Sequence, residues 1–370
     1  MNKQRFSVLL SILAILVISL SGTPVQARPN SAGAVYTMTN SATGNQVIRY
    51  NRSADGSLTW SGVFSTDGLG TGAGLGNQGG LVLSQNGRWL LVVNAGSSDI
   101  SVFQVNHRSL RLTDKTDSKG VMPISITVNE DLAYVLNAGT SGSVGNIAGF
   151  HLSSDGRLSS IPGSVQPLSG VTAPAQISFN PTGTVLVVTE KSTSLIDTYK
   201  VNSHGIAQPL ATHASNGATP FGFAFDPTGH LIVSEAGGGP QGTSAVSSYD
   251  VSGSGGLTTI SPSVPDTQIA ACWLVVSGNG RFAYTSNTRS NSISTYTINA
   301  DGSISLLHSI GASTGTGPLD MALSRNSRFL YEFNSGDHTI EGFRVSANGG
   351  LTLVGTVSGV PAGADGLAAN

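Results

Sequence analysis

Cysteine is almost absent from this sequence, since Cys272 is the only one among 370 residues. A single thiol cannot form an intrachain disulfide, so the packed core alone must stabilise the fold. Charge is also scarce, because Asp, Glu, Lys and Arg together make up 10% of the chain. No basic stripe is present, which argues against nucleic acid as a partner.

Long apolar runs are missing too, apart from one at residues 6–20, FSVLLSILAILVISL. Lys3 and Arg5 precede this run, and the small-residue stretch PVQA ends at Ala27. This order predicts a cleaved signal peptide at 1–27, with 28–370 as a single domain. The run is shorter than the roughly 20 residues that span a bilayer, although a retained anchor is the alternative. We therefore expect a secreted or periplasmic protein that leaves the membrane after cleavage.

Removing residues 1–27 takes away two basic residues and no acidic ones. The mature chain then has 18 − 2 = 16 basic residues against 20 acidic residues, a net charge of about −4. Glycine is abundant, with 48 residues, while apolar residues remain at 39%. Short apolar runs separated by Gly, Asn, Asp and Ser are typical of an all-β protein with many tight turns.

The apolar runs follow a repeat. One type of run lies at 81–84, 125–128, 177–180, 223–226, 274–277 and 321–324, a period of about 44–52 residues. A turn such as NPTG or SGNG follows, then a second run such as WLLVVN, then a third such as ISVFQV and a DG-type turn. Four strands at this period predict the blade of a β-propeller. A β-helix has shorter repeats, and a sandwich does not repeat so regularly.

The two ends complete the number of blades. Residues 34–40, AVYTMTN, form a second run without a first, and residues 365–370, DGLAAN, form a first run without a second. If the C-terminal strand joins the N-terminal blade, the chain makes a closed seven-bladed propeller.

A polar residue ends each second run, and we call this position the slot. Its occupants are Asn40, Asn94, Asn137, Glu190, Glu235, Asn287 and Asn334. Asparagine at a strand end commonly caps a turn. Glutamate caps turns poorly and is costly to bury, so Glu190 and Glu235 are candidate catalytic carboxylates. They lie in adjacent blades, where an approach of the two carboxylates would raise one pKa.

A second group of candidates lies at the starts of the inner strands, facing the expected central channel: Gln176, Phe221, Trp273, Asp320 and Asp365. Two aromatic rings with amide and carboxylate neighbours suit a small polar ligand. The alternative is that the rings simply plug the channel. No cofactor is predicted, although these oxygens also admit a Ca²⁺-like cation. The histidines show no zinc or copper spacing.

The repeats, with stretches such as LLVVNAGSSDISVF and AYTSNTRSNSISTY, resemble the β-propeller lactonase family and the YVTN-type surface propellers. That family includes bacterial 6-phosphogluconolactonases and fungal carboxymuconate lactonizing enzymes. The resemblance covers residues 33–370 and implies a channel pocket, a catalytic histidine on an inner strand, and arginines that hold an anionic group. Here the histidine positions are Gly80, Ile124, Gln176, Gly222, Trp273, Asp320 and Gly366, and the arginine positions are Ala175 and Leu319. The family glutamate matches Glu190.

The resemblance thus implies an exported lactonase-like hydrolase of a small organic lactone, in which Glu190 or Glu235 activates water. Without the arginines, phosphorylated and polycarboxylate substrates are disfavoured. The alternative is a non-catalytic propeller that binds an envelope protein, a glycan or a small ligand. Either protein is expected to be a monomer.

Overall fold

The computed structural model describes residues 32–238 and 242–370, which belong to one compact unit, Ser31–Asn370. The predicted signal peptide lies outside the described residues. Within them the chain forms strands and turns, and none of its elements is a helix long and apolar enough to cross a membrane.

The strands form seven antiparallel sheets, numbered here as blades and listed from the inner to the outer strand. Blade 1 contains β29 (Asp365–Ala369), β1 (Gly33–Met38), β2 (Gln46–Arg52) and β3 (Leu58–Ser65). Blade 2 contains β4 (Leu81–Leu83), β5 (Trp89–Asn94), β6 (Asp99–Val105) and β7 (Leu110–Asp117). Blade 3 contains β8 (Pro123–Asn129), β9 (Leu132–Asn137), β10 (Asn146–Leu152) and an outer strand divided into β11 (Leu158–Ser160) and β12 (Gln166–Pro167).

The other four blades repeat this order without interruption. Blade 4 contains β13 (Pro174–Phe179), β14 (Val185–Glu190), β15 (Leu195–Lys200) and β16 (Ala211–Ala214). Blade 5 contains β17 (Pro220–Phe225), β18 (Leu231–Glu235), β19 (Ala245–Val251) and β20 (Leu257–Pro265). Blade 6 contains β21 (Ala271–Val276), β22 (Phe282–Asn287), β23 (Ser292–Ile298) and β24 (Ile304–Ser313). Blade 7 contains β25 (Pro318–Leu323), β26 (Phe329–Asn334), β27 (Thr339–Val345) and β28 (Leu351–Ser358).

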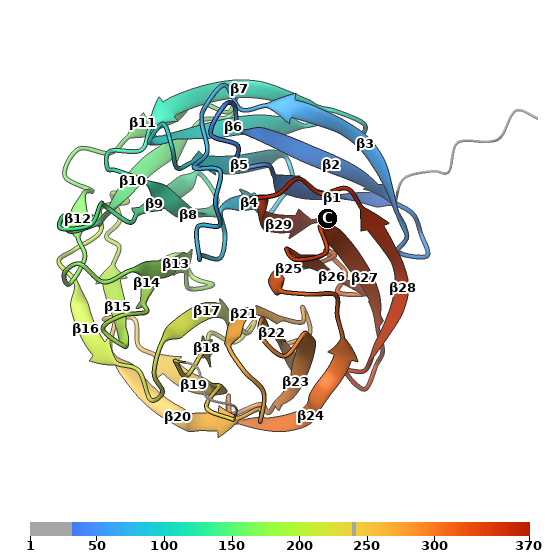
Figure 1. The fold of residues 1–370 in the computed structure, drawn as a ribbon. Helices are drawn as coiled ribbons and strands as arrows, with labels where there is room; N and C mark the ends of the chain where they lie inside the picture. The colour runs from blue at the N-terminus through green and yellow to red at the C-terminus, as the bar shows by residue number, and fades with distance from the viewer. Residues whose placement is uncertain (1–31, 239–241) are drawn as a thin grey trace, which may run out of the picture. The chain divides into compact units, whose positions relative to one another are not determined.

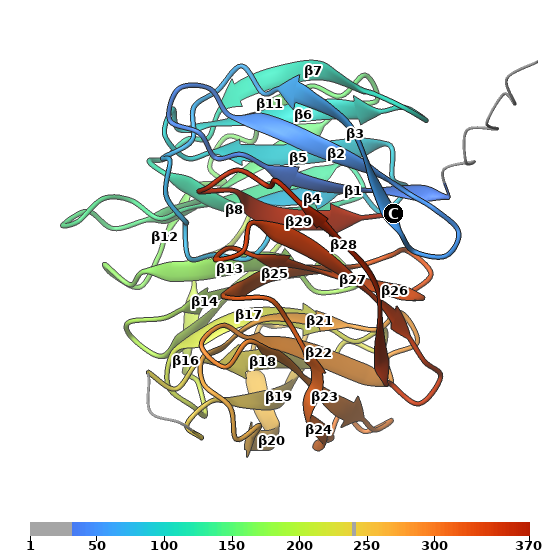
Figure 2. The ribbon, with the colours of Figure 1, turned by 45° about the vertical axis from the view of Figure 1, so that its right-hand side comes forward.

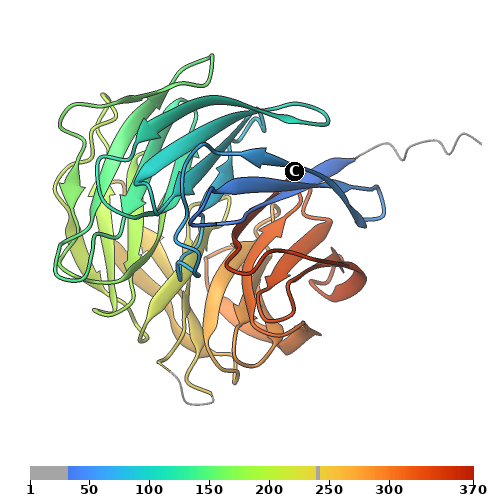
Figure 3. The ribbon, with the colours of Figure 1, turned by 45° about the horizontal axis from the view of Figure 1, so that its top comes forward.

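The seven blades are arranged in a ring, which confirms the predicted seven-bladed β-propeller (Figure 1). The predicted closure is confirmed as well, because β29 pairs antiparallel with β1, with Val35 opposite Ala369. The first and last coloured strands therefore lie side by side where the ring closes (Figures 2 and 3). With both ends of the chain in one sheet, no blade can separate without breaking that sheet.

Burial explains the composition of the strands. Every residue of β5, β14 and β26 is buried, since a middle strand is covered by the neighbouring blades on both faces. Outer strands such as β3 are mostly half-exposed or exposed, and they carry more polar residues. The turns between first and second strands use glycine with positive φ, 70° at Gly183 and 69° at Gly280, as the NPTG and SGNG motifs predict.

Buried tyrosines join neighbouring blades. The hydroxyl groups of Tyr134, Tyr284 and Tyr331 donate to the carbonyl oxygens of Gly205, Gly349 and Gly56, each in an outer turn of the next blade. The third of these bonds links blade 7 to blade 1. A buried ring with a satisfied hydroxyl adds apolar area without leaving a polar atom unpaired.

Candidate functional site

Glu235 ends β18 and is 1% exposed, with its carboxylate surrounded by donors. The N–H of Gly217 and the hydroxyl of Ser247 donate to Oε1 at 2.8 and 2.6 Å, and Ser215 donates to the same atom at 3.2 Å. The hydroxyl of Ser263 donates to Oε2 at 2.7 Å. Four donors satisfy the carboxylate, which ties three strands of blade 5 to the connection that precedes β17.

Glu190 ends β14, is fully buried, and has a different set of partners. The N–H of Ser169 donates to Oε1 at 3.2 Å, and the hydroxyls of Ser169 and Thr193 donate to Oε2. The neighbouring carboxyl group is that of Asp197 in β15, in the same blade. The expected approach of Glu190 to Glu235 is therefore replaced by separate networks within blades 4 and 5.

Asp197 is fully buried, and its two carboxyl oxygens accept no hydrogen bond from the described residues. Burial, reinforced by the nearby Glu190 carboxylate, raises the pKa of Asp197 to about 7. Blades 2 and 6 have Ser101 and Ser294 at the equivalent position, where each accepts a hydrogen bond from the slot asparagine. Blade 4 thus contains a buried acidic pair where those blades have a neutral pair.

Five slot side chains lie against the connection that enters the inner strand of their own blade: Asn94, Asn137, Glu190, Glu235 and Asn334. Asn40 instead bonds to Thr71 and Ala73, in the connection that enters blade 2. A Cβ on Gly217 would lie 2.2 Å from Oε2 of Glu235, so only glycine fits there. Asn94, Asn137 and Asn334 lie in the same way against Gly68, Gly120 and Gly315. The slot therefore anchors blade connections in asparagine and glutamate blades alike.

The five inner-strand candidates lie at or near the channel. Phe221 and Trp273 are in contact, with ring centroids 4.8 Å apart, and both are buried. Gln176 pairs with the free edge of β17, since its Nε2 donates to the Phe223 carbonyl at 2.9 Å and its Oε1 accepts from the Phe223 N–H at 2.7 Å. The two rings are occupied with each other and the Gln176 amide is occupied with Phe223, so these three side chains have few free groups for a ligand.

Asp320 and Asp365 come from adjacent blades, 7 and 1. Asp320 accepts from the N–H groups of Met321 and Leu367 at 2.8 and 3.2 Å, which places it at the closure of the ring. Asp365 accepts from the N–H of Leu75 at 3.1 Å through Oδ2, while its buried Oδ1 has no partner among the described residues. Burial raises the pKa of Asp365 to about 7, and burial together with the Asp365 charge raises that of Asp320 well above its usual range.

Residues 75–79, which we call the crossing segment, run across the channel near these carboxyl groups. Gln78 reaches blade 6, where its Nε2 donates to the Leu274 carbonyl at 2.7 Å and its Oε1 accepts from the Leu274 N–H at 3.0 Å. The Trp273 indole donates to the Asn77 carbonyl at 2.7 Å, and the Asn77 amide donates to the Ile124 carbonyl. The segment therefore contacts blades 3 and 6 and closes this end of the channel.

Lys191 immediately follows the slot residue Glu190 and points toward the crossing segment. Its Nζ donates to the Gly76 carbonyl and lies 5.0 Å from the centroid of the Phe221 ring. Burial lowers the pKa of Lys191 to about 8, although the nearby Asp365 carboxylate favours the charged form. Burial also raises the pKa of the Cys272 thiol to about 11, so this cysteine is a neutral thiol near pH 7.

We call the group Lys191, Phe221, Trp273, Asp320 and Asp365, together with the crossing segment, the closed mouth of the channel. It brings together one ammonium group, two carboxyl groups and two aromatic rings beneath a stretch of backbone. Gly80, one of the positions where the resemblance expects histidine, has no room for a side chain. A Cβ there would lie 2.7 Å from Cε of Met38 and 3.2 Å from Oδ1 of Asp365.

Lys191, Asp197 and the crossing segment were not among the sequence-based candidates. Lys191 did have a signal, because the residues following the other six slots are all uncharged: Ser41, Ala95, Ala138, Ala236, Thr288 and Ser335. The crossing segment had a weaker signal, two amide side chains inside the glycine-rich stretch 66–80. For metals, the described residues contain no group of three or more His, Cys, Asp or Glu that could hold an ion.

Several solved structures are similar to the chain in fold. A candidate 6-phosphogluconolactonase from Bacteroides fragilis is 18% identical, with a TM-score of 0.69 over 92% of this chain and 98% of that one. A periplasmic gluconolactonase from Pseudomonas aeruginosa is also 18% identical, with a TM-score of 0.69 over 90% and 98%. A protein from Lactobacillus plantarum is 16% identical, with a TM-score of 0.72 over 91% and 99%.

No curated protein matches this chain. The family model described as "Lactonase, 7-bladed beta-propeller" matches residues 30–167, 145–265 and 256–365. These matches span nearly the whole of the ring, in agreement with the resemblance carried by the repeats. The chain therefore belongs to the seven-bladed β-propeller lactonase family.

Proposed function

We propose that this protein is a lactonase-type hydrolase that opens a small, uncharged organic lactone at the closed mouth. The observation that carries the proposal is the Asp365 carboxyl group in the channel. It has a pKa of about 7, an oxygen without a hydrogen-bond partner among the described residues, and Lys191 nearby. A carboxyl group with a pKa near neutrality suits general base catalysis.

In this mechanism the Asp365 carboxylate removes a proton from water as the water oxygen attacks the lactone carbonyl carbon. The Lys191 ammonium group stabilises the negative charge that develops on the carbonyl oxygen. The bond between the carbonyl carbon and the ring oxygen then breaks. The ring oxygen takes the proton that Asp365 removed from water, which restores the Asp365 carboxylate, and the product is an open hydroxy acid.

Two features of the closed mouth bear on the substrate. Lys191 is the cationic group that contacts the crossing segment, and the positions of the family arginines are Ala175 and Leu319. Because Lys191 is assigned to the carbonyl oxygen, a phosphate or a second carboxylate on the substrate would lose its hydration without a cation of its own, so an uncharged lactone fits best. The crossing segment covers Asp365, so the mechanism requires this segment to move when the substrate enters.

The assignment of Glu190 and Glu235 as the catalytic carboxylates stays a prediction. Their surrounding donors favour an anchoring role, because the oxygens of both carboxylates are already engaged by neighbouring N–H and hydroxyl groups. Lactone hydrolysis by variants of Glu190, Glu235 and Asp365 distinguishes the two glutamates from Asp365 as the catalytic carboxylate.

The test is hydrolysis of a lactone panel by the purified mature protein, followed by pH-stat titration. The panel contains D-glucono-1,5-lactone, γ-butyrolactone, dihydrocoumarin and 6-phospho-D-gluconolactone. We expect turnover of an uncharged member, which Asp365→Asn lowers by at least about 10²-fold while Glu190→Gln and Glu235→Gln retain it. Loss of turnover in the glutamate variants but not in Asp365→Asn would reverse the assignment.

A non-catalytic binding propeller is the second candidate. It is supported by the crossing segment itself, whose hydrogen bonds to blades 3 and 6 fill the closed mouth with backbone. The absence of turnover on every panel member, with a folded protein, would favour this candidate.

We also propose export, with cleavage after Ala27 and a monomer in the periplasm or outside the cell. The proposal is supported by the order of charged, apolar and small residues at 1–27. Intact mass of the protein recovered from periplasm and medium tests it, since a mature chain beginning at Arg28 is expected. A full-length chain in the membrane fraction would indicate a retained anchor.

A further inference from the structure

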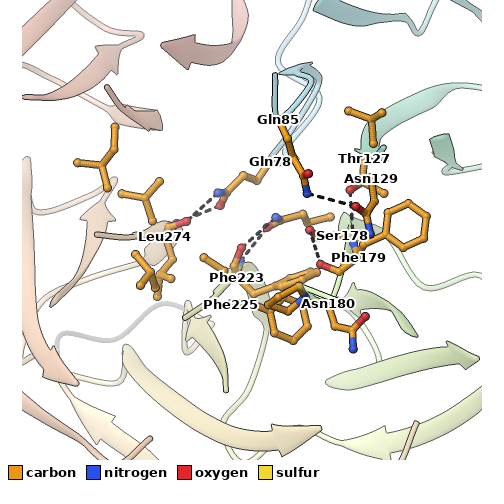
Figure 4. A pocket seen from close by; sticks show the side chains of 17 residues that line it. Gln78, Gln85, Thr127, Asn129, Ser178, Phe179, Asn180, Phe223, Phe225 and Leu274 are labelled. Atoms are coloured by element: carbon orange, nitrogen blue, oxygen red, sulfur yellow. Dashed lines mark hydrogen bonds between the residues drawn. The ribbon is translucent and has the colours of Figure 1, made fainter. Parts of the chain in front are cut away.

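The opposite end of the channel is an open cavity of about 430 Å³, which we call the open mouth (Figure 4). Inner strands of blades 3 to 7 form its wall, and Gln85 from the turn of blade 2 lies at its rim. The seventeen residues that line it are Gln78, Gln85, Thr127, Val128, Asn129, Gln176, Ser178, Phe179, Asn180, Pro181, Phe223, Ala224, Phe225, Leu274, Val275, Val276 and Leu323. None of them has an ionisable side chain.

Main-chain groups of the inner strands point into this cavity. An inner strand has a neighbour on one side only, so alternate residues turn their N–H and C=O groups toward the channel. In β17 the N–H and C=O of Phe223 bond to Gln176, and the N–H of Asp226 bonds to the carbonyl of His230, which directly precedes the neighbouring strand β18. By this alternation, the N–H and C=O of Phe225 face the channel as those of Phe223 do.

The same alternation applies to β21. Leu274 bonds to Gln78 across the channel, and the N–H of Ser277 bonds to the Phe282 carbonyl, so the main-chain groups of Val276 face the channel. Phe225 and Val276 both line the open mouth. The cavity therefore presents uncharged donors and acceptors from two adjacent blades.

Side chains complete the lining. Gln78 and Gln176 form the inner end of the cavity, with their amides already bonded to Leu274 and Phe223 (Figure 4). At the rim the Gln85 amide donates to Oδ1 of Asn129 at 3.2 Å, which joins blades 2 and 3. Ala224, Val275 and Leu323 add apolar surface between these polar groups.

We propose that the open mouth binds a neutral polyhydroxylated ligand, such as one unit of a sugar. A hydroxyl group both donates and accepts, which matches the paired N–H and C=O groups of Phe225 and Val276. The carbon-bound hydrogens of a sugar ring match the apolar wall. A phosphate, carboxylate or ammonium group is disfavoured, because the lining offers no opposite charge to offset its desolvation. The volume lies in the range of small-molecule sites.

The test is isothermal titration of the mature protein with D-glucose, D-galactose and maltose. D-gluconate and D-glucose 6-phosphate serve as charged counterparts of the same ring chemistry. We expect saturable binding of a neutral sugar at millimolar concentration, a common range for weak small-ligand binding. Binding of the charged sugars is expected to be at least about tenfold weaker.

Two variants locate the binding. Ser178→Trp fills the cavity and is expected to weaken binding at least about tenfold, whereas Ser203→Trp, on an exposed outer turn, leaves it unchanged. If Ser178→Trp does not fold, Gln85→Ala at the rim replaces it, with an expected loss of about threefold or more. Asp365→Asn retains sugar binding, which separates this proposal from the proposed lactone chemistry.

Three results would overturn the proposal: no saturable binding of any of the three neutral sugars, equal binding of the charged sugars, or full binding by Ser178→Trp. A cavity that holds water alone gives the first of these results.

Discussion

The two mouths of the channel are built from the same inner strands, yet they differ in charge and access. The closed mouth contains Lys191, Asp320 and Asp365 beneath the crossing segment. The open mouth has a lining without an ionisable side chain and a cavity of about 430 Å³. The difference shows that the ring supplies the walls, while a blade connection determines which end is accessible.

The connection responsible is residues 66–80, between β3 and β4. The corresponding connections at 266–270 and 314–317 are shorter. Only the long connection carries Asn77 and Gln78 into the channel, where their amides bond to main-chain groups of other blades. Inner-strand edges have unpaired N–H and C=O groups, and side-chain amides can satisfy both together.

The largest expected effect concerns catalysis, which we propose for the closed mouth and not for the open mouth. Asp365→Asn is expected to lower kcat/KM for the lactone by about 10²- to 10⁴-fold, because the amide cannot act as a base. Ser178→Ala, in the open mouth, is expected to leave kcat/KM within about twofold. Equal losses of kcat/KM in the two variants would contradict the assignment of catalysis to the closed mouth. The measurement is initial rate against lactone concentration, with circular dichroism to verify folding.

The next effect is the dependence of stability on pH. The pKa values of Asp365 and Asp197 are raised to about 7, so the folded state holds their protons more tightly than the unfolded state does. Their contribution is complete below about pH 4 and is lost as pH rises toward 7, by up to about 1.4 kcal/mol per pH unit for each group. The raised pKa values of Asp320 and Glu332 act in the same direction.

Lys191 acts in the opposite direction at higher pH. Its pKa is lowered to about 8, so the unfolded state binds the proton more tightly, and the contribution of Lys191 to stability rises between about pH 8 and 10.5. The raised pKa of Cys272 offsets this rise above about pH 9. Urea unfolding from pH 4 to 10 is expected to show a minimum near pH 7–8. Lys191→Met should remove the rise, and Asp197→Asn should reduce the fall. A monotonic curve in the wild-type protein would count against these pKa values.

A smaller effect compares the two glutamines that pair with strand edges. Gln78→Ala and Gln176→Ala each leave one buried N–H and one C=O unpaired, and each is expected to lower the free energy of unfolding by about 2 kcal/mol. Gln78→Ala should also change the fluorescence of Trp273, because the indole is bonded to the neighbouring Asn77. Gln176→Ala is the matched control, with little expected change in that fluorescence. Identical emission spectra for the two variants would show that Gln78 does not hold the crossing segment.

The smallest expected effect is that of pH on the open mouth. With no ionisable side chain in its lining, sugar affinity should change by less than about twofold between pH 6 and 9. Calorimetry across this range measures it. A sharp change near pH 7 or 8 would mean that Asp365 or Lys191 communicates with the open mouth.

The sequence predicted most of the fold, and its site residues remain predictions. The repeat of runs and turns indicated seven blades, because each blade needs the same alternation of apolar strand and glycine turn. It also identified Gln176, Phe221, Trp273, Asp320 and Asp365 as channel residues, because the inner strand occupies the same position in every repeat. The catalytic assignment of Glu190 and Glu235 is untested, but their hydrogen bonds to blade connections show a local anchoring contribution.

The feature that sequence reasoning did not find depends on contacts between distant residues. Gln78 and Leu274 are 196 positions apart, and their pairing exists only because the closed ring brings blades 2 and 6 to the same channel. Lys191 likewise acquires its lowered pKa from burial beneath residues of blade 2. The sequence by itself determined the strands, turns and number of blades, since these follow from local periodicity. The tertiary structure decided which mouth is charged and which is open, because both depend on where a long connection meets strand edges across the ring.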